Sequence, residues 1–302
     1  MVTVKKKSVL GYEYYYLIYN YREEHQVKTI DKEIGKELPE NMEEIKEEFI
    51  QTIVDKRWIA EIEEIKNDYN KKLESIPSLL RAEHLKDFGI RFTHNTNKIE
   101  GSTLTLRDVE LVINEPEVPI NKSTDHIVEA KLHMKIYENM VNSIDTTDLS
   151  MGVILKWHKS IFNLHPNRTN FAGLIRKGQI YISGSNYVPP PGGFDCEDLL
   201  DQLFIWYEEN PRKIHPVLLS CLMHLRFVSI HPFDDGNGRM ARLLMNFILF
   251  QNRYPMFDIP ANIRKSYYNS LEKANLKEDE MSFVGWFFKN YLKSIRSLRI
   301  PK

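Results

Sequence analysis

One stretch of twelve residues, HPFDDGNGRMAR from His231 to Arg242, gathers most of the groups in this chain that could do chemistry. Gly236 and Gly238 allow a tight turn, and an apolar pattern of helical spacing follows it. A Gly-rich turn that leads into a helix presents unpaired backbone N–H groups and the positive end of the helix dipole. Phosphate is the usual occupant of such an anion site, so the stretch is predicted to bind a phosphorylated ligand.

Charged side chains around the turn extend this prediction. Arg239 and Arg242 are three positions apart, so they share a helix face and can both donate to phosphate oxygens. Asp235 can hold Mg²⁺ through one oxygen, and His231 is suited to removing a proton near neutral pH. Together these groups suit attack on phosphorus by an activated hydroxyl group. The alternative is a surface turn that happens to carry several charges.

At every specified position the stretch resembles the Fic motif, HPFx(D/E)GN(G/K)RxxR. Fic proteins mostly transfer AMP from ATP to a Ser, Thr or Tyr hydroxyl group of a target protein. The resemblance implies that His231 deprotonates that hydroxyl, that Asp235 holds Mg²⁺ and that Asn237 positions the α-phosphate. It further implies that the backbone at Gly236 and Gly238 forms the anion hole.

The resemblance also gives separate roles to the two arginines. Arg239 would clamp the phosphates, and Arg242 would take the γ-phosphate. Pro232 and Phe233 would be structural, with the Phe ring anchoring the loop in the core. The phosphate-transferring branch of the family lacks the second glycine, so the presence of Gly238 favours nucleotidyl transfer.

Composition excludes several other classes of function. The chain has 302 residues, of which 42% are hydrophobic and 27% charged, and its net charge is −1. A near-zero charge without a basic stripe argues against a nucleic-acid or membrane-surface partner. Its two cysteines have neither metal-ligand nor disulfide spacing, and no apolar run of 18 residues occurs. We therefore expect a soluble, cytoplasmic protein.

The elements that must position the motif are predicted to be mostly helical, as a Fic-type helical bundle with a β-hairpin flap and a short N-terminal β-hairpin extension. Residues 1–41 would form a tyrosine-rich β extension, with a turn at 22–26 and its tyrosines packed on the body rather than exposed as a binding face. Residues 42–120 would be helical, and 121–302 would be the Fic catalytic domain with C-terminal helices. Apolar spacing and caps predict helices over 40–73, 78–97, 105–112, 124–142, 150–162, 195–209 and 216–230, one after the motif, and two at the end.

A second informative stretch, TNKIEG, ends the helix predicted over 78–97. Thr96 and Glu100 share a helix face at i and i+4, and Gly101 ends the helix. A carboxylate at a helix C-terminus opposes the dipole and needs a cationic partner. The stretch resembles the (S/T)xxxE(G/N) inhibitory motif of many Fic proteins, in the segment 93–101. The resemblance implies that Glu100 pairs with Arg242 and blocks the γ-phosphate.

Residues 171–193 interrupt the helical pattern. Alternation in GQIYIS, a turn at GSN and an extended YVPPPGG predict a β-hairpin. In Fic proteins the equivalent flap aligns the target segment by strand-like pairing, and Ile180, Tyr181 and Ile182 would form that edge. An ordinary surface hairpin is the alternative.

Tyrosine and histidine side chains outside the two motifs give further predictions. By resemblance Tyr268, beside Tyr267, would lie near the adenine base, while a core role for either tyrosine is the alternative. His224 is predicted to be a core histidine. Four others lack ligand spacing and are predicted to be solvated or to lie at the core edge: His126, His133, His158 and His165.

The motifs favour a self-inhibited protein AMP-transferase that uses ATP and Mg²⁺, with auto-AMPylation as a further expected activity. A target protein with a hydroxyl side chain would be its partner, and a homodimer is compatible with the family. Two alternatives stay open: removal of AMP by the same site, and a non-catalytic nucleotide-binding regulator. An intact His231 argues against the regulator, because phosphate binding does not require a base there.

Overall fold

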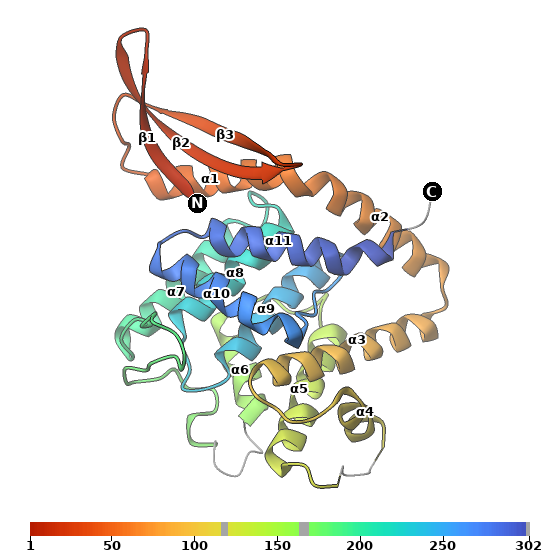
Figure 1. The fold of residues 1–302 in the computed structure, drawn as a ribbon. Coiled ribbons are helices and arrows are strands. Elements are labelled where there is room, and N and C mark those ends of the chain that lie inside the picture. The colour runs from red at the N-terminus through yellow and green to blue at the C-terminus, as the bar shows by residue number, and fades with distance from the viewer. Residues whose placement is uncertain (116–119, 163–168, 300–302) are drawn as a thin grey trace.

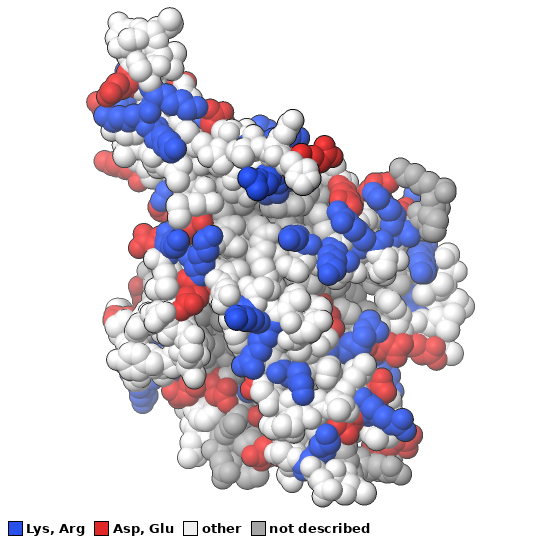
Figure 2. All heavy atoms as spheres, viewed as in Figure 1, with Lys and Arg blue, Asp and Glu red and all other residues white. Residues whose placement is uncertain are grey.

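A small antiparallel sheet lies over a larger helical body in the computed structural model, which describes residues 1–115, 120–162 and 169–299 (Figure 1). The mostly helical architecture is as predicted. Lysine, arginine and acidic side chains are interspersed over the face in Figure 2, in keeping with the net charge of −1.

The sheet consists of β1 (Val2–Val9), β2 (Tyr12–Glu23) and β3 (Gln26–Gly35), in the order β1-β2-β3. The predicted hairpin is the β2–β3 pair, which turns at Glu24 and His25. The extra strand β1 was missed because three consecutive lysines hide the alternation expected of a strand. Tyr19 is buried, as packing on the body requires, but Tyr12 is mostly exposed.

The helix predicted over 40–73 is one continuous element with an irregular centre. It comprises α1 (Met42–Val54), a π-helical turn (Asp55–Ile59) and α2 (Ala60–Ser75). The turn carries Trp58, whose ring stacks on Phe288 at a centroid distance of 5.1 Å. α3 (Ser78–Ile99) then begins directly after Pro77, as predicted.

The helical body agrees closely with the predicted ranges. The Thr105 capping box opens α4, with both of its hydrogen bonds formed. The helices of the body are α4 (Leu106–Asn114), α5 (Thr124–Asn142), α6 (Met151–Phe162), α7 (Phe194–Glu209), α8 (Pro216–Ile230), α9 (Asn237–Gln251), α10 (Arg264–Leu276) and α11 (Met281–Ile295). Short 3-10 turns cover Thr169–Phe171, Ala261–Ile263 and Arg296–Leu298.

Two adjacent helices at the centre of the body carry the motif between them. All residues of α9 from Met240 to Leu249 are buried, and α8 is buried along most of its length. A helix covered on every side is typical of the middle of a large core. The loop between α8 and α9 is therefore anchored at both ends to rigid elements.

The flap does not form the predicted β-hairpin. Its two arms meet at a turn, where the Ser185 N–H donates to Ile182 O at 3.1 Å, but they contain no strand. The second arm carries three prolines at positions 189–191, which have no N–H to donate to a ladder. Side chains join the arms instead, and the Gln179 amide donates to Pro189 O at 2.9 Å.

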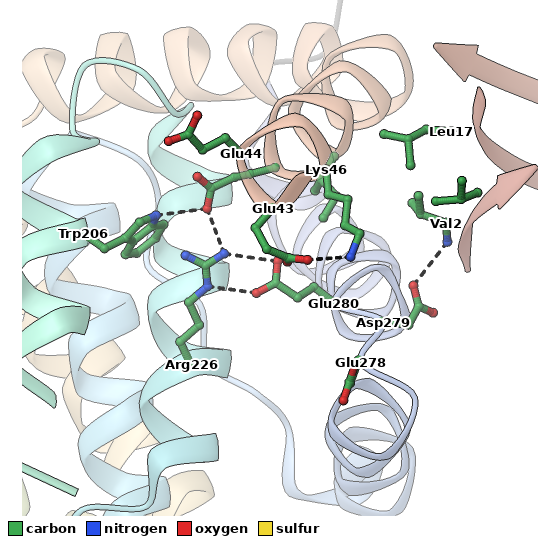
Figure 3. A pocket seen from close by; sticks show the side chains of 13 residues that line it. Val2, Leu17, Glu43, Glu44, Lys46, Trp206, Arg226, Glu278, Asp279 and Glu280 are labelled. Carbon is green, nitrogen blue, oxygen red and sulfur yellow. Dashed lines mark hydrogen bonds and ion pairs between the residues drawn. The ribbon is translucent and has the colours of Figure 1, made fainter. Parts of the chain in front are cut away.

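One ion-pair cluster ties the N-terminal region to the body. Arg226 of α8 donates to Glu47 of α1 at 2.8 Å and to Glu280, just before α11, at 2.9 Å (Figure 3). The Arg226 guanidinium also lies 4.2 Å from the Trp206 ring centroid. Within the described residues, no helix combines the length and the apolar character needed to cross a bilayer.

Candidate active site

The motif loop begins where α8 ends and stops where α9 starts. His231 adopts a left-handed conformation, with φ 54° and ψ 58°, and its N–H still donates to Phe227 O at 3.0 Å. Gly236 precedes α9 with φ 84°, and a Cβ there would press against the Phe162 ring. The glycine is therefore required both by the backbone conformation and by the space.

These residues face a cavity of about 730 Å³, between the flap, the motif loop and α10. His231, Asp235, Gly236 and Gly238 line one side of it, and Glu100 lies beside them. A smaller cavity of about 280 Å³ lies between the sheet, α1 and the start of α11 (Figure 3). Because Arg226 and its carboxylates pair with one another there, the larger cavity is the candidate site.

His231 is oriented for use as a base. Its Nδ1 lies 3.1 Å from the Val228 carbonyl oxygen, which can only accept. Nδ1 is therefore the protonated nitrogen, and Nε2 keeps its lone pair. Burial lowers the pKa of His231 below its ordinary value, against opposing effects of the Val228 hydrogen bond and of Glu100 and Asp235. The imidazole is neutral at pH 7 and able to take a proton.

Asp235 fits the expected role in holding a metal ion. Its side chain is 42% exposed and lines the cavity, while Oδ1 accepts from the Gly236 N–H at 2.6 Å and lies 3.4 Å from Arg239 Nη2. The described residues contain no cluster of three or more His, Cys, Asp or Glu side chains with metal-binding geometry. A single carboxylate together with substrate phosphates and water is a common way to hold Mg²⁺.

Arg239 is buried at the base of the loop. It pairs with Glu129 of α5 at 3.4 Å and lies 5.1 Å from the Phe162 ring centroid. Its Nε has no hydrogen-bond partner among the described residues. A buried donor without a partner is costly, so an anion brought close to this guanidinium would be favoured.

Arg242 is almost fully enclosed by the groups predicted to restrain it. Its Nη2 donates to Glu100 Oε1 at 2.6 Å, and its Nε donates to Thr96 Oγ1 at 2.6 Å. The Glu100 carboxylate also lies against Gly238, where a Cβ would overlap Oε1. The sequence-predicted trio of Thr96, Glu100 and Arg242 is thus in direct contact, with a carboxylate at the N-terminus of α9.

Both polar atoms of the Asn237 side chain form hydrogen bonds within the motif loop. Its Oδ1 accepts from the Phe233 N–H at 2.9 Å, and its Nδ2 donates to Phe233 O at 2.7 Å. Contact between this side chain and an α-phosphate stays a prediction; Nδ2 carries a second N–H that these two bonds do not use. Phe233 is fully buried, as expected of an anchor.

The two tyrosines of α10 face different surroundings. Tyr267 is buried, and its hydroxyl lies 2.9 Å from Nε2 of His224, the predicted core histidine. Tyr268 is 37% exposed and lines the cavity, with the Arg264 guanidinium 5.2 Å from its ring centroid. Both tyrosines line the cavity, but Tyr268 is the more exposed of the two, and its contact with an adenine base stays a prediction.

The flap covers the cavity from the other side. Ile180, Tyr181 and Ile182 all line it, and Tyr181 is the most exposed of the three. Glu272 of α10 fastens the far end of the flap, because its Oε1 accepts from the Asn186 N–H at 2.6 Å and from Ser185 Oγ at 3.2 Å.

Sequence reasoning missed His158, which supports the motif loop. The prediction that it lies in solvent or at the core edge is wrong. Its ring stacks on Phe233 at 3.7 Å, Nδ1 accepts from the Gly173 N–H at 2.9 Å, and Nε2 lies 3.0 Å from Asp235 O. Burial lowers its pKa to about 4, so it is neutral and donates to Asp235 through Nε2. A lone histidine in an apolar helix gave no signal of this role.

The other three histidines in that set differ from one another. His133 is fully buried and lies 2.9 Å from Thr93 Oγ1, so its predicted place at the core edge is also wrong. His126 accepts from the Thr103 N–H at 3.3 Å near the surface, as predicted. His165 lies outside the described residues.

Comparisons with known proteins agree with this geometry. Residues 148–249 match the sequence model of the Fic/DOC family. A protein from Drosophila virilis named protein adenylyltransferase Fic is 31% identical over 231 residues, which cover 76% of this chain and 46% of that protein. The chain thus spans about half the length of the curated relatives it matches.

Solved structures share the fold. A Fic family protein from Desulfovibrio desulfuricans has a TM-score of 0.65 at 26% identity, covering 79% of this chain and 72% of that one. A Fic domain containing signaling protein from Bacteroides thetaiotaomicron has a TM-score of 0.69 at 24% identity, with 78% and 94% coverage. The chain belongs to the Fic/DOC family and carries its Fic domain in residues 148–249.

Proposed function

We propose that this protein transfers AMP from ATP to a hydroxyl side chain of a target protein, and that Glu100 restrains the reaction. One observation carries the proposal: an imidazole with a free Nε2 faces the same cavity as the N-terminus of α9. The relatives named protein adenylyltransferase Fic support it.

The residues suggest a simple sequence of events. His231 Nε2 takes the proton of the target hydroxyl as its oxygen attacks the α-phosphorus of ATP. The bond from this phosphorus to the bridging oxygen of the β-phosphate breaks, and pyrophosphate leaves. The helix N-terminus and Arg239 stabilise the negative charge of the phosphates. Mg²⁺, held by Asp235, would neutralise part of that charge.

The restraint follows from competition for Arg242. Its guanidinium donates to Glu100 and Thr96, so a γ-phosphate must displace the carboxylate to reach it. Two anions cannot share this buried site without strong repulsion. ATP that binds beside Glu100 would therefore be misaligned for in-line attack.

Labelled ATP tests this proposal. We expect the Glu100→Gly variant with Mg²⁺ to retain label on protein from α-labelled ATP but not from γ-labelled ATP. Adding His231→Ala should abolish this labelling while ATP still binds. Because the protein itself offers exposed hydroxyl groups, self-labelling serves as the first readout. ATP binding without labelling in every variant would favour a nucleotide-binding regulator.

Removal of AMP from a modified target is a second candidate. Glu100 has a carboxylate that is 32% exposed and lines the cavity with His231, so it can orient a water molecule. A protein pre-labelled with AMP separates the two reactions. Wild type should release AMP and Glu100→Gly should not if removal dominates.

We also propose that the reaction takes place in the cytoplasm. Cys196 and Cys221 are both buried and unpaired, which suits a reducing compartment. A homodimer is proposed from the family resemblance and is tested by the molar mass in solution.

A further inference from the structure

Arg176 is a buried cation whose role neither the motif nor the proposed reaction explains. Its side chain is 1% exposed. Within the described residues it forms no ion pair with a carboxylate, and its side chain donates to four backbone carbonyl oxygens. Guanidinium nitrogens buried in this way are retained only where several acceptors compensate for lost hydration.

Two of its acceptors belong to the turn that carries the proposed base. Nε donates to His231 O at 2.7 Å, and Nη2 lies 3.3 Å from Ile230 O. These two carbonyl groups close α8 just where His231 adopts its left-handed conformation. That conformation is unfavourable for a residue with a Cβ, so it persists only where the surroundings fix it.

The other two acceptors lie on opposite arms of the flap. Nη1 donates to Gly178 O at 2.8 Å on the first arm, and Nη2 donates to Pro190 O at 2.6 Å on the second. Since the proline arm cannot form a ladder, these side-chain bonds replace the missing strand pairing. The guanidinium therefore joins both flap arms to the motif turn.

The backbone at the same residue makes two further links. The Arg176 N–H donates to Pro232 O at 2.9 Å, and the Gly193 N–H donates to Arg176 O at 2.9 Å. Behind it, a Cβ on Gly192 would overlap the backbone of Lys177 and Gly178. The base of the flap is consequently closed around this one side chain.

We propose that Arg176 is a positioning residue that locks His231 and the flap into one unit, so that the base and the target segment are aligned together. It contacts neither nucleotide nor target and acts through His231 and the flap. The inference rests on the proposed transfer reaction and assigns a task to a residue outside the motif.

Two substitutions separate the effect of the planar guanidinium geometry of Arg176 from the effect of its charge. Arg176→Lys keeps the charge but cannot reach four carbonyl groups spread over the planar fork. Arg176→Gln removes the charge as well. In the Glu100→Gly background we expect both to lower kcat by about 10²-fold, the effect of a misplaced catalytic group. The dissociation constant for ATP with Mg²⁺ should stay within about threefold, because the α9 N-terminus does not depend on Arg176.

The pH profile adds a readout that a merely structural role would not change. Burial is the main cause that lowers the pKa of His231, and the charge of Arg176 lowers it further, while Glu100 and Asp235 raise it. Arg176→Gln should therefore move the acidic limb of kcat/KM to higher pH, whereas Arg176→Lys should leave it in place. All of these variants carry Glu100→Gly, so the charge of residue 100 is the same in each.

Arg226→Lys is the matched control. Arg226 lies on α8, the helix that leads to His231, and its guanidinium likewise binds more than one acceptor. Its acceptors are carboxylates away from the cavity, and it lies over the Trp206 ring. Its substitution should lower stability without changing kcat or the pH limb. An equal loss of kcat in Arg226→Lys would show that weakening the contacts of any such arginine disturbs the site. It would overturn the positioning role proposed for Arg176.

A second measurement needs no activity and separates this inference from the proposed function. Chymotrypsin should cut after the exposed Tyr181 of the flap about tenfold faster in Arg176→Lys than in wild type, at equal overall stability. Unchanged cleavage, full kcat in Arg176→Lys, or a proportional loss of ATP binding would each overturn the proposal. If Glu100→Gly transfers nothing while Arg176→Lys still loosens the flap, the proposed reaction fails and the positioning role stands.

Discussion

At the scale of single residues, the candidate site depends on the neutral imidazole of His231 and on Arg242, for which Glu100 and a γ-phosphate would compete. The motif is contiguous in the chain, so its chemistry could be predicted from spacing alone. Thr96 and Glu100 lie more than 140 residues before Arg242, and a resemblance rather than a physical pattern linked them. Arg176 and His158 could not be predicted, because a lone arginine or histidine shows nothing of the carbonyl groups that tertiary packing brings to it.

The proposed role of His231 as the base predicts how transfer depends on pH. Its pKa lies below 6.5 because of burial, and only the neutral form accepts a proton. The kcat/KM of the Glu100→Gly variant should therefore rise as pH increases through that pKa and level off above it. A limb centred above pH 7 would exclude His231 as the group that titrates.

Thr96 supports the restraint on Arg242. Thr96→Val keeps the shape but removes the acceptor 2.6 Å from Arg242 Nε, leaving a buried donor unpaired at a cost of about 1–3 kcal/mol. The guanidinium should then turn more readily to a γ-phosphate, so transfer should rise, though less than in Glu100→Gly. Thr96→Ser is the matched control and should behave as wild type; equal rates for Val and Ser would contradict the role of this hydrogen bond.

At the scale of elements, helices were predicted well because apolar spacing and capping act locally. The flap was predicted wrongly. The alternation in GQIYIS suggested a β-hairpin, but the three prolines of the second arm cannot donate the backbone hydrogen bonds that a hairpin needs. Strand β1 was missed for the opposite reason: tertiary pairing overrides a lysine run. In both segments the residue pattern of one arm does not show whether the neighbouring arm can pair with it.

The tip of the flap is fastened by Glu272. Glu272→Ala removes the acceptor for the Asn186 N–H and Ser185 Oγ, so the flap tip should become mobile while its base stays closed. We expect a higher KM for a protein target, several-fold, with ATP binding unchanged. Hydrogen exchange at residues 180–187 measures the loosening, and Glu272→Gln, which keeps an acceptor oxygen, is the control. Unchanged exchange in the Ala variant would contradict the tether.

At the scale of the whole molecule, three histidines are enclosed in the same body that holds the site. Burial lowers the pKa to about 3 for His133, to about 4 for His158 and to about 3 for His224. Of the three, only His224 was predicted to be a core histidine, because a helix covered on all sides has no polar face to reveal which residues lie inside. The histidines give the fold a dependence on pH.

The sign of this dependence follows from proton uptake. Below about pH 6.5 the unfolded chain protonates these imidazoles while the native state does not, so the free energy of unfolding falls as pH drops toward 4. Each imidazole should contribute at most about 1.4 kcal/mol per pH unit, a limit reached only where the unfolded chain is fully protonated and the native state is not. Urea unfolding at pH 7, 6 and 5 measures it. His224→Gln should reduce the slope, and an equal slope in the variant would contradict the assignment.

We propose that the contact between Glu100 and Arg242 holds back an adenylyl transfer that His231 would otherwise catalyse. The most direct measurement is the initial rate of protein labelling from α-labelled ATP with Mg²⁺, in wild type and in Glu100→Gly. We predict a rate at least about tenfold higher in the variant, equivalent to about 1.4 kcal/mol of restraint, and no label once His231→Ala is added. Equal rates in wild type and Glu100→Gly, or label that survives the loss of His231, would contradict the account.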